Sequence, residues 1–345
     1  MRMAVSLNRW SGGWVRAFVT IGLTFALTAV LIAFSGKSPI TAYEALFRGA
    51  FGSFDRAAFA LNKATPYIIS GIGIALCFRA GIINIGAEGQ IALGGLAATW
   101  VALSWPQANV LVGIPLAFLG GAVAGALWSG VAAAIHVGRG VNEVLATLLL
   151  NFVALLLVGE ALHDRLGEPG AGFPQSPLFE PNYWLSTVIT GLQLHVGVII
   201  APLAAVGGYV LLRYTTLGFA IRVMGTSRSA ATYAGFSVPW LTIRLMLMAG
   251  ALAGLAGAIE VLGIHYRLIE GFSNGFGFNA VVVALLGGLH PLAIVPAGLF
   301  FGFLEAGALS MQREVGVPSS LVSVIQGLTM LFVLAALAST RQRTN

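Results

Sequence analysis

The residues most able to do chemistry in this sequence are Asn84, Glu88 and Gln90, within the stretch GIINIGAEGQ at 81–90. They offer one charge and several hydrogen-bonding groups, but no nucleophile. Ionisable groups are costly in lipid, so they normally face the protein interior or a water-filled path. The glycines between them predict a helix break, which is tolerated at membrane depth only where it is buried in protein or lines a cavity. We therefore predict a passage for a polar solute rather than a reaction centre.

A second set of polar residues lies in or beside apolar runs: Asn142, Glu143, Asn151, Glu260 and Glu305. Such groups either line a path or form structural hydrogen bonds between helices, each worth about 1 kcal/mol. The structural role is the simpler interpretation for Gln90, Asn151 and Glu260. Glu305 is close to the predicted outer end of its run, where we expect it to reach water.

The sequence lacks the P-loop motif of proteins that hydrolyse ATP and the usual motifs of a metal centre. In the P-loop pattern G-x-x-x-x-G-K-[ST], the first glycine would fall on Leu31, five residues before Gly36. The single cysteine, Cys77, excludes an internal disulfide and a cysteine-based metal cluster. The histidines share no metal-ligand spacing: they are His136, His163, His195, His265 and His290. We expect no enzymatic activity and no cofactor in this chain.

The elements that position these groups are long apolar helices. The chain is 58% hydrophobic and only 9% charged, whereas soluble domains are about 25% charged. Since a bilayer span needs roughly 20 mostly apolar residues, we predict an all-α polytopic membrane protein with about ten spans. These are 15–34, 65–80, 85–104, 109–135, 143–160, 192–212, 241–263, 276–289, 292–309 and 318–338. The first run has no A-x-A cleavage site after it, so we expect a retained span.

The basic residues predict the topology. They gather at both ends of the chain, at Arg2, Arg9, Arg341 and Arg343, and in alternate loops. By the positive-inside rule, both termini are expected in the cytoplasm. The net charge of +6 then reflects topology and contact with anionic lipid, and predicts no nucleic-acid partner.

Three connecting segments are polar enough to leave the bilayer core. Residues 36–64 mix aromatic and charged residues at helical spacing, which predicts an amphipathic outer segment. Residues 161–191 are rich in proline and glycine and predict an outer loop. The whole chain, 1–345, is expected to form a single transmembrane domain that includes these segments.

The third segment, 213–240, is the large inner loop. Thr226 and Ser227 could cap a short helix that ends at Gly235. A solvated connector and a docking element for a cytoplasmic partner explain this loop equally well on physical grounds.

Glycine spacing predicts close helix packing. Pairs four residues apart recur at Gly121 and Gly125, at Gly250 and Gly254, and at Gly298 and Gly302. Such spacing allows helix backbones to approach one another, so we expect a compact bundle.

Four motifs, in order, resemble a known family. They are GIINIGAEGQIALGG (81–95), VNEVLATLLLNFVALLL (141–157), LGFAIRVMGTSRSAATYAGFSV (217–238) and GFGFNAVVVALLGGLHPLAIVPAGLFFGFLEAGA (275–308). They are similar to the permease subunits of bacterial ABC importers in the ribose/branched-chain amino-acid permease superfamily. The resemblance covers about residues 36–338 and is closest to the nucleoside and simple-sugar branch.

The resemblance implies a type II-like importer fold and an importer assembly. The expected partners are a cytoplasmic ATPase that binds ATP and Mg, a second permease chain, which would be a paralogue, and a substrate-binding lipoprotein or periplasmic protein. The cargo would be a nucleoside or a simple sugar. Binding proteins supply most of the selectivity of such importers, so the permease needs only a weak, hydrated passage.

The resemblance also assigns residues. The polar positions of the first two motifs, which we infer to lie along the translocation path, are Asn84, Glu88, Asn142, Glu143 and Asn151. The third motif matches the segment that docks into the ATPase, and its coupling residues are Arg222, Gly225, Arg228, Ala230, Ala231 and Gly235.

Two other classes remain open. An ion-coupled secondary transporter would carry its own coupling carboxylates at the midplane, and Glu88 and Glu260 are the candidates. A scaffold protein is also possible, but it gives no reason for a polar break in a membrane helix.

Overall fold

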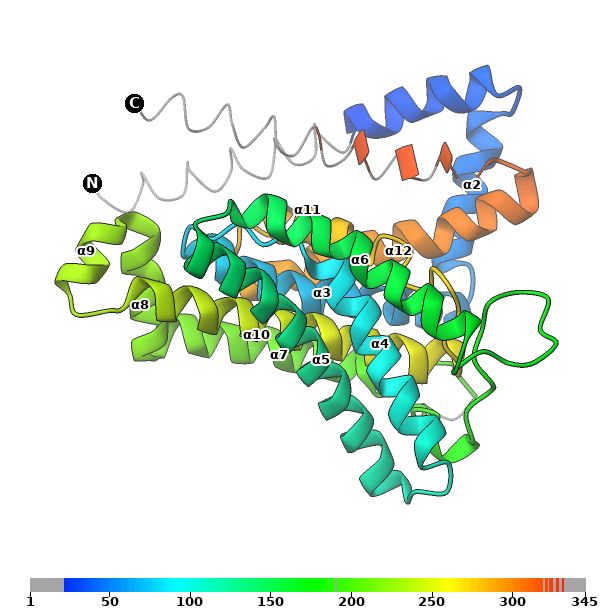
Figure 1. The fold of residues 1–345 in the computed structure, drawn as a ribbon. Coiled ribbons are helices and arrows are strands. Elements are labelled where there is room, and N and C mark those ends of the chain that lie inside the picture. Colours follow the sequence, from blue (N-terminus) through cyan, green and yellow to red (C-terminus); the bar gives the residue numbers. More distant parts are fainter. Residues whose placement is uncertain are drawn as a thin grey trace. The chain divides into compact units, whose positions relative to one another are not determined.

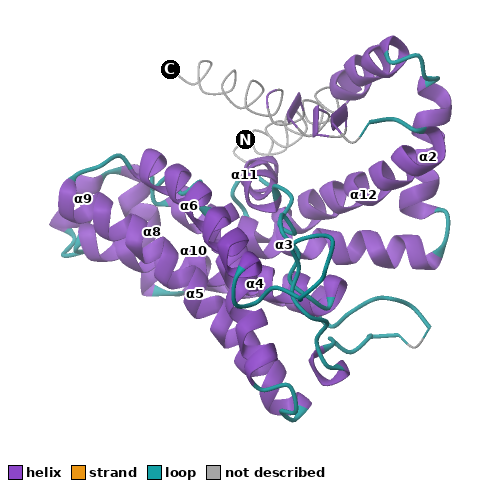
Figure 2. Ribbon diagram, turned by 45° about the vertical axis from the view of Figure 1, so that its right-hand side comes forward, coloured by secondary structure: helices purple, strands orange, loops and turns teal. Residues whose placement is uncertain are grey.

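The computed structural model describes residues 22–189 and 191–318, together with residues 320, 321, 323, 324, 327, 328 and 331. Figure 2 shows helices joined by loops throughout this part of the chain. Within it, the only β-type pairings are two isolated bridges, Gln175 with Ile269 and Thr187 with His195. The all-α prediction is therefore confirmed for the described residues.

The chain divides into two compact units, which we describe separately: Leu61–Gly302, and a second unit of 1–60 together with 303–345. The second unit contains the helix Gly22–Phe34, helix α2 (Pro39–Phe51), the start of α3 (Phe54–Arg79) and the end of α12 (Pro291–Val315). In this unit, Glu314 near the end of α12 forms an ion pair with Arg56 of α3, at 3.3 Å, and lies 3.8 Å from Arg48 of α2.

The amphipathic segment predicted over 36–64 has different bounds in the structure. Only Pro39–Phe51 forms a separate helix, because Pro39 begins it and the chain turns at Gly52. From Phe54 onwards the chain already belongs to α3, which has an acidic residue, Asp55, in its first turn. Acidic residues there are favourable because they face the positive end of the helix dipole.

The unit Leu61–Gly302 holds all the predicted site residues. Its helices after α3 are α4 (Ala87–Ser104), α5 (Val110–Arg139), α6 (Glu143–His163), η1 (Pro181–Tyr183), α7 (Gly197–Tyr214), α8 (Thr216–Thr226), α9 (Arg228–Tyr233), α10 (Val238–Glu260), the π-helical turn η2 (Val261–His265), α11 (Phe276–Leu286) and the first part of α12. In Figure 1, α9 lies at one end of this unit, and the loop after α6 lies at the opposite end. The predicted outer and inner loops are thus on opposite sides of the bundle.

Helix α10 is the centre of this unit, packed against α4 and α5 through glycines. A Cβ atom on Gly250 would overlap the carbonyl oxygen of Gly125, and one on Gly254 would overlap that of Gly121. A Cβ on Gly94 would collide with the backbone of Gly254 from the other side. The close approach predicted from glycine spacing is therefore confirmed for α5 and α10. A residue with a side chain at any of these glycines would not fit at the crossing.

Six described helices are long and apolar enough to cross a membrane: α3, α5, α6, α7, α10 with η2, and α12. The prediction of ten spans is therefore only partly met. Helix α11 has 11 residues, too few for the roughly 20 that a span needs. Most of the predicted last span, 318–338, and the start of the first, 15–34, lie outside the described residues.

Candidate functional site

The predicted helix break is present between α3 and α4. The backbone leaves the helix after Arg79 and resumes at Ala87, with Gly81 at φ +73°. Asn84 is buried in this extended stretch, and its Oδ1 accepts hydrogen bonds from the backbone nitrogen of Gly86 at 2.8 Å and from Nε2 of Gln90 at 3.3 Å. The amide side chain thus takes over the role of the missing helical carbonyls.

Helix α6 braces the break from the side. Asn151 donates from Nδ2 to the carbonyl oxygen of Ile85 at 2.9 Å and accepts at Oδ1 from the nitrogen of Gly89 at 2.9 Å. One turn earlier, the Thr147 hydroxyl accepts from the nitrogen of Ile85 at 3.3 Å. Asn151 thus makes the hydrogen bonds between helices that the structural interpretation expects, and its place on the translocation path stays a prediction. Sequence reasoning missed Thr147, although its spacing of four residues from Asn151 puts both on one helix face.

Glu88 is 3% exposed and is held by the start of another helix. Its Oε1 accepts from the Ser273 hydroxyl at 2.6 Å and from the nitrogen of Gly275 at 3.0 Å, and its Oε2 accepts from the nitrogen of Gly277 at 2.7 Å. Gly275 caps α11, and Glu88 itself lies in the first turn of α4. The positive ends of two short helices therefore meet at one carboxylate, which is the favourable sign of charge for both dipoles.

Two neighbours of this junction, Arg79 and Ser273, have other partners or roles than their sequence positions suggest. Arg79, which could have paired with Glu88, donates instead from Nε to the carbonyl oxygen of Leu289 at 2.7 Å. Residues 271–275, Gly-Phe-Ser-Asn-Gly, match the spacing of a serine-hydrolase nucleophile motif. In that motif the serine lies between a strand and a helix. Here a turn precedes α11, and the Ser273 hydroxyl donates a hydrogen bond to Glu88.

The other two predicted path residues lie apart from this cluster. Asn142 is exposed and caps α6, accepting from the nitrogen of Val144 at 2.8 Å. Glu143 is half-buried beside His136, with 3.5 Å between its Oε2 and the ring Nδ1. The predicted set therefore separates into three buried residues around the break and two at the start of α6.

The inner loop contains the predicted short helix. Ser227 caps α9 by accepting at its hydroxyl from the nitrogen of Ala230, at 3.2 Å. The helix ends at Tyr233, and Gly235 follows in the left-handed region at φ +85°. Thr226 instead ends α8, whose first turn is capped by Thr215.

The predicted coupling residues do not all reach the surface. Five of them are exposed: Arg222, Gly225, Arg228, Ala230 and Gly235. The sixth, Ala231, is fully buried in the cluster around Ile221 and Met224. The largest exposed side chain of α9 is Tyr233, at 93%. The predicted set of coupling residues does not include Tyr233, because that set rests on the basic and small residues of the motif.

The coupling segment contacts the helix break directly. Arg228 donates from Nη2 to the carbonyl oxygen of Gly81 at 3.3 Å. A Cβ atom on Gly225 would overlap the carbonyl oxygen of Arg79. Burial, together with the charge of Arg79, lowers the pKa of the nearby His290. Two motifs far apart in the sequence thus form one physical unit at this end.

At the other end of α10, Glu260 forms a buried ion pair. Its Oε1 lies 2.6 Å from Lys63 Nζ and 3.5 Å from His265 Nε2. The pair joins α3 to the point where α10 becomes π-helical. The structural interpretation of Glu260 is confirmed, and both carboxylates considered for ion coupling bind residues of the chain itself.

Comparisons with known proteins agree with the resemblance seen in the motifs. A family model described as "Branched-chain amino acid transport system / permease component" matches residues 56–334. The guanosine ABC transporter permease protein NupP of Bacillus subtilis is 36% identical, over 93% of this chain and 92% of its own. The glucose ABC transporter permease protein TsgB13 of Haloferax volcanii is 35% identical, over 92% and 86%. A second guanosine permease of B. subtilis, NupQ, is 26% identical, over 71% and 79%.

Proposed function

The chain belongs to the branched-chain amino acid transport permease family, and we propose that it is the membrane subunit of an ATP-driven importer for a nucleoside or a simple sugar. The observation that carries the mechanism is the contact of α9 with the helix break, through Arg228 and Gly81. A push on α9 from a cytoplasmic protein would reach the break without an intervening loop.

The break and its braces would form the wall of the translocation path. Asn84, Glu88 and Asn151 support this wall from within the protein by their hydrogen bonds. Asn142 and Glu143, at the surface end of α6, would meet the solute with polar groups. No tight cargo pocket is needed, because a binding protein would deliver the solute.

The assembly would contain an ATPase that supplies ATP and Mg, a binding protein, and a second permease chain. NupP and NupQ carry the same guanosine label in one organism, which supports a paralogous rather than identical partner. The chain would form a single ten-helix transmembrane domain of the type II-like fold, in the inner membrane, with both termini in the cytoplasm.

The test is uptake of radiolabelled guanosine and glucose into vesicles that hold the permease pair, the ATPase and the binding protein. We expect the vesicles to take up either guanosine or glucose, and only when they contain both ATP and the ATPase. Uptake driven by a proton or sodium gradient, without ATP, would support the ion-coupled class instead. Competition by unlabelled nucleosides or sugars then identifies the cargo class.

A further inference from the structure

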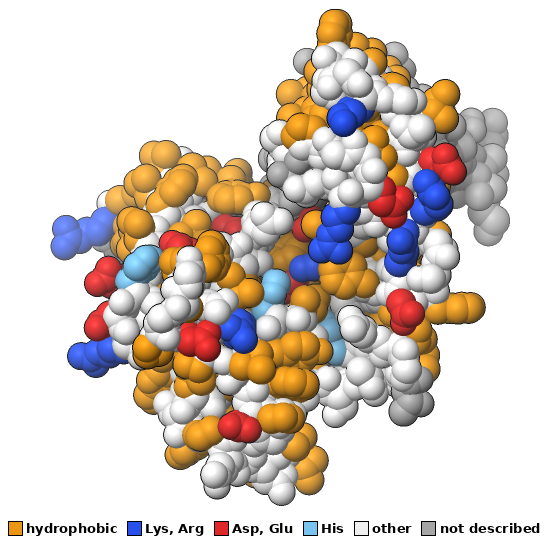
Figure 3. Space-filling view, turned by 90° about the vertical axis from the view of Figure 1, so that its right-hand side faces the viewer, with side chains coloured by type: hydrophobic (Ala, Val, Ile, Leu, Met, Phe, Trp, Pro, Cys, Tyr) orange, Lys and Arg blue, Asp and Glu red, His pale blue; other side chains and the backbone are white. Residues whose placement is uncertain are grey.

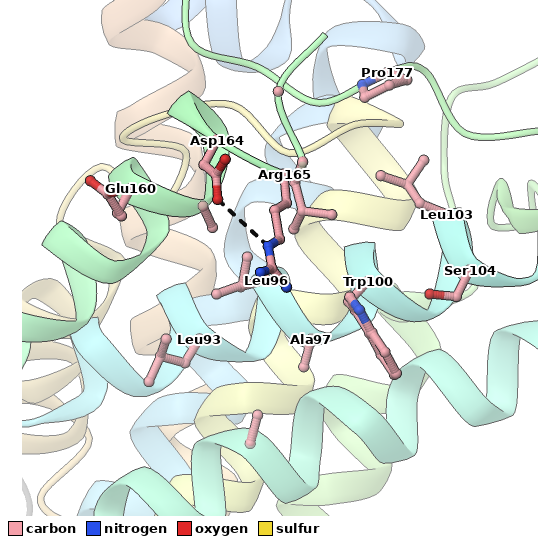
Figure 4. Close-up of a pocket in the computed structure, with 14 residues that line it drawn as sticks. Leu93, Leu96, Ala97, Trp100, Leu103, Ser104, Glu160, Asp164, Arg165 and Pro177 are labelled. Atoms are coloured by element: carbon pink, nitrogen blue, oxygen red, sulfur yellow. Dashed lines mark ion pairs between the residues drawn. The ribbon is translucent and has the colours of Figure 1, made fainter.

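A groove of about 930 Å³ opens between α4, α5 and the end of α6, away from the helix break. It is lined by Leu93, Leu96, Ala97, Trp100, Leu103, Ser104, Ala124, Glu160, Ala161, Asp164, Arg165, Leu166, Gly167 and Pro177. Figure 4 shows side chains of α4 forming the floor, with Asp164 and Arg165 at the rim. Its volume is at the upper end of the roughly 300–1,000 Å³ typical of small-molecule sites.

The floor has the chemistry and length of a lipid tail. From Leu93 to Leu103 its lining residues on α4 are Leu, Ala and Trp. Ten residues of helix cover about 15 Å, which is half of the roughly 30 Å hydrocarbon core and therefore one leaflet. Trp100 is 62% exposed along this floor. A polar cargo would find few hydrogen-bond partners on such a surface.

The rim carries charges of both signs. Asp164 and Arg165 lie 3.6 Å apart and are 71% and 91% exposed, and Glu160 lies one turn before them on α6. An exposed pair of this kind contributes only about 0–1 kcal/mol, so either partner is free to bind another ion. Figure 3 shows the molecule from the right-hand side of Figure 1, with acidic and basic side chains among apolar areas.

We propose that this groove binds a phospholipid with a primary amine in its headgroup, of the phosphatidylethanolamine class. One acyl chain lies along α4 from Leu103 to Leu93. The phosphate meets the Arg165 guanidinium, and the ammonium group donates to Asp164 and Glu160. Two carboxylates against one guanidinium disfavour an anionic headgroup. A choline headgroup has no N–H to donate, so it binds these carboxylates less well.

The headgroup arm of the test uses the purified permease complex in detergent. Phosphatidylethanolamine, phosphatidylcholine and phosphatidylglycerol with identical tails are added in turn, and retained lipid is counted by native mass spectrometry. We expect phosphatidylethanolamine to be retained several-fold more than the other two. The single variant Arg165→Ala should abolish this preference. The double variant that combines Glu160→Gln with Asp164→Asn should abolish it too. Arg139→Ala, an exposed arginine outside the groove, is the matched control and should keep it.

The tail arm uses tryptophan fluorescence. Phosphatidylethanolamine with brominated tails should quench part of the emission, and Trp100→Phe should remove that part, whereas Trp240→Phe at the opposite end should not. Size-exclusion profiles of all variants establish that they are folded. Equal retention of the three lipids, or unchanged preference in Arg165→Ala, would overturn the proposal. So would disulfide cross-linking of an Ala97→Cys variant to the second permease chain, because protein would then cover the groove.

Discussion

The backbone of Gly277 lies directly against that of Glu88, so that a Cβ atom on Gly277 would overlap the nitrogen and Cα of Glu88. The first turns of α4 and α11 therefore touch backbone to backbone, and the Glu88 carboxylate closes the contact by accepting from Gly277. Discontinuous helices that meet in this way are typical of transport sites in membrane proteins. The junction is buried and has no room for a side chain, so it depends on glycine.

Gly277→Ala should destabilise the protein. The added methyl group has to push the two helix ends apart, and overpacking of this kind typically costs about 1–3 kcal/mol. The measurement is thermal unfolding of the purified permease in detergent. Gly207→Ala is the control, since it lies within α7 with nothing near its missing Cβ, and it should be neutral or stabilising by up to about 1 kcal/mol. Equal melting temperatures of the two variants would contradict the close contact.

Glu88→Gln should lower both stability and uptake. Both oxygens of Glu88 accept hydrogen bonds from the α11 end, and the amide group of Gln can accept with only one of its two ends. A buried donor left unsatisfied costs about 1–3 kcal/mol. Thermal unfolding and vesicle uptake are measured together. Glu180→Gln, the same change at an exposed position, should alter neither, and a Glu88→Gln protein as stable as the original would rule out the capping role.

The exposed face of α9 is the predicted contact for the ATPase. Tyr233→Ala should reduce co-purification of the ATPase and ATP-driven uptake about tenfold or more, since large exposed aromatics are the common anchors of interfaces. Ala230→Glu should act in the same way without unfolding the chain. Tyr214→Ala, an exposed tyrosine that precedes α8, serves as the control.

Ala231→Glu separates docking from folding. Because Ala231 is fully buried, a carboxylate there has neither room nor a counter-charge, and we expect loss of the folded permease rather than loss of docking alone. Pull-down of the ATPase and size-exclusion of the permease distinguish the two. A monodisperse Ala231→Glu permease that only fails to bind the ATPase would show that this side chain reaches the interface.

The buried pair of Lys63 and Glu260 should show strong coupling. Removing one partner leaves a buried charge unpaired, which costs about 3–5 kcal/mol, so Lys63→Met and Glu260→Gln should each be strongly destabilised. The double variant should recover much of the loss. A double-mutant cycle of unfolding free energies measures this. Additive losses would mean that the pair is not formed in the membrane.

The orientation of the chain can be tested at two exposed positions on opposite ends. On a Cys77-free background, Gly172→Cys in the loop after α6 should react with an impermeant thiol reagent added to intact cells. Ser229→Cys on α9 should react only after the membrane is opened. Both positions are exposed in the structure, so lack of reaction reports topology rather than burial. The reverse pattern would invert the predicted orientation.

Much of this protein follows from local features of its sequence. Composition predicts the helical membrane class, since lipid cannot solvate polar groups and the residues that face it must therefore be apolar. The glycines around Asn84 predict the break, and Ser227 predicts the start of α9, because caps and left-handed turns depend on residues only a few positions apart. The four motifs predict the family, which the comparisons confirm. Six of the ten predicted spans are helices long and apolar enough to cross a membrane, whereas α4 and α11 are not among them. The first and last predicted spans lie partly outside the described residues.

Only the tertiary structure decides which groups meet. Ser273 and Glu88 are 185 residues apart, and Lys63 and Glu260 are 197 apart, so no local pattern links them. Likewise, Ala230 and Ala231 are identical in sequence terms, yet one faces solvent and the other is buried. A polar residue in an apolar run has the same local signature whether it lines a path or closes a helix junction. Which of these it does depends on the backbone that packs against it, and that is set by the folding of the whole bundle.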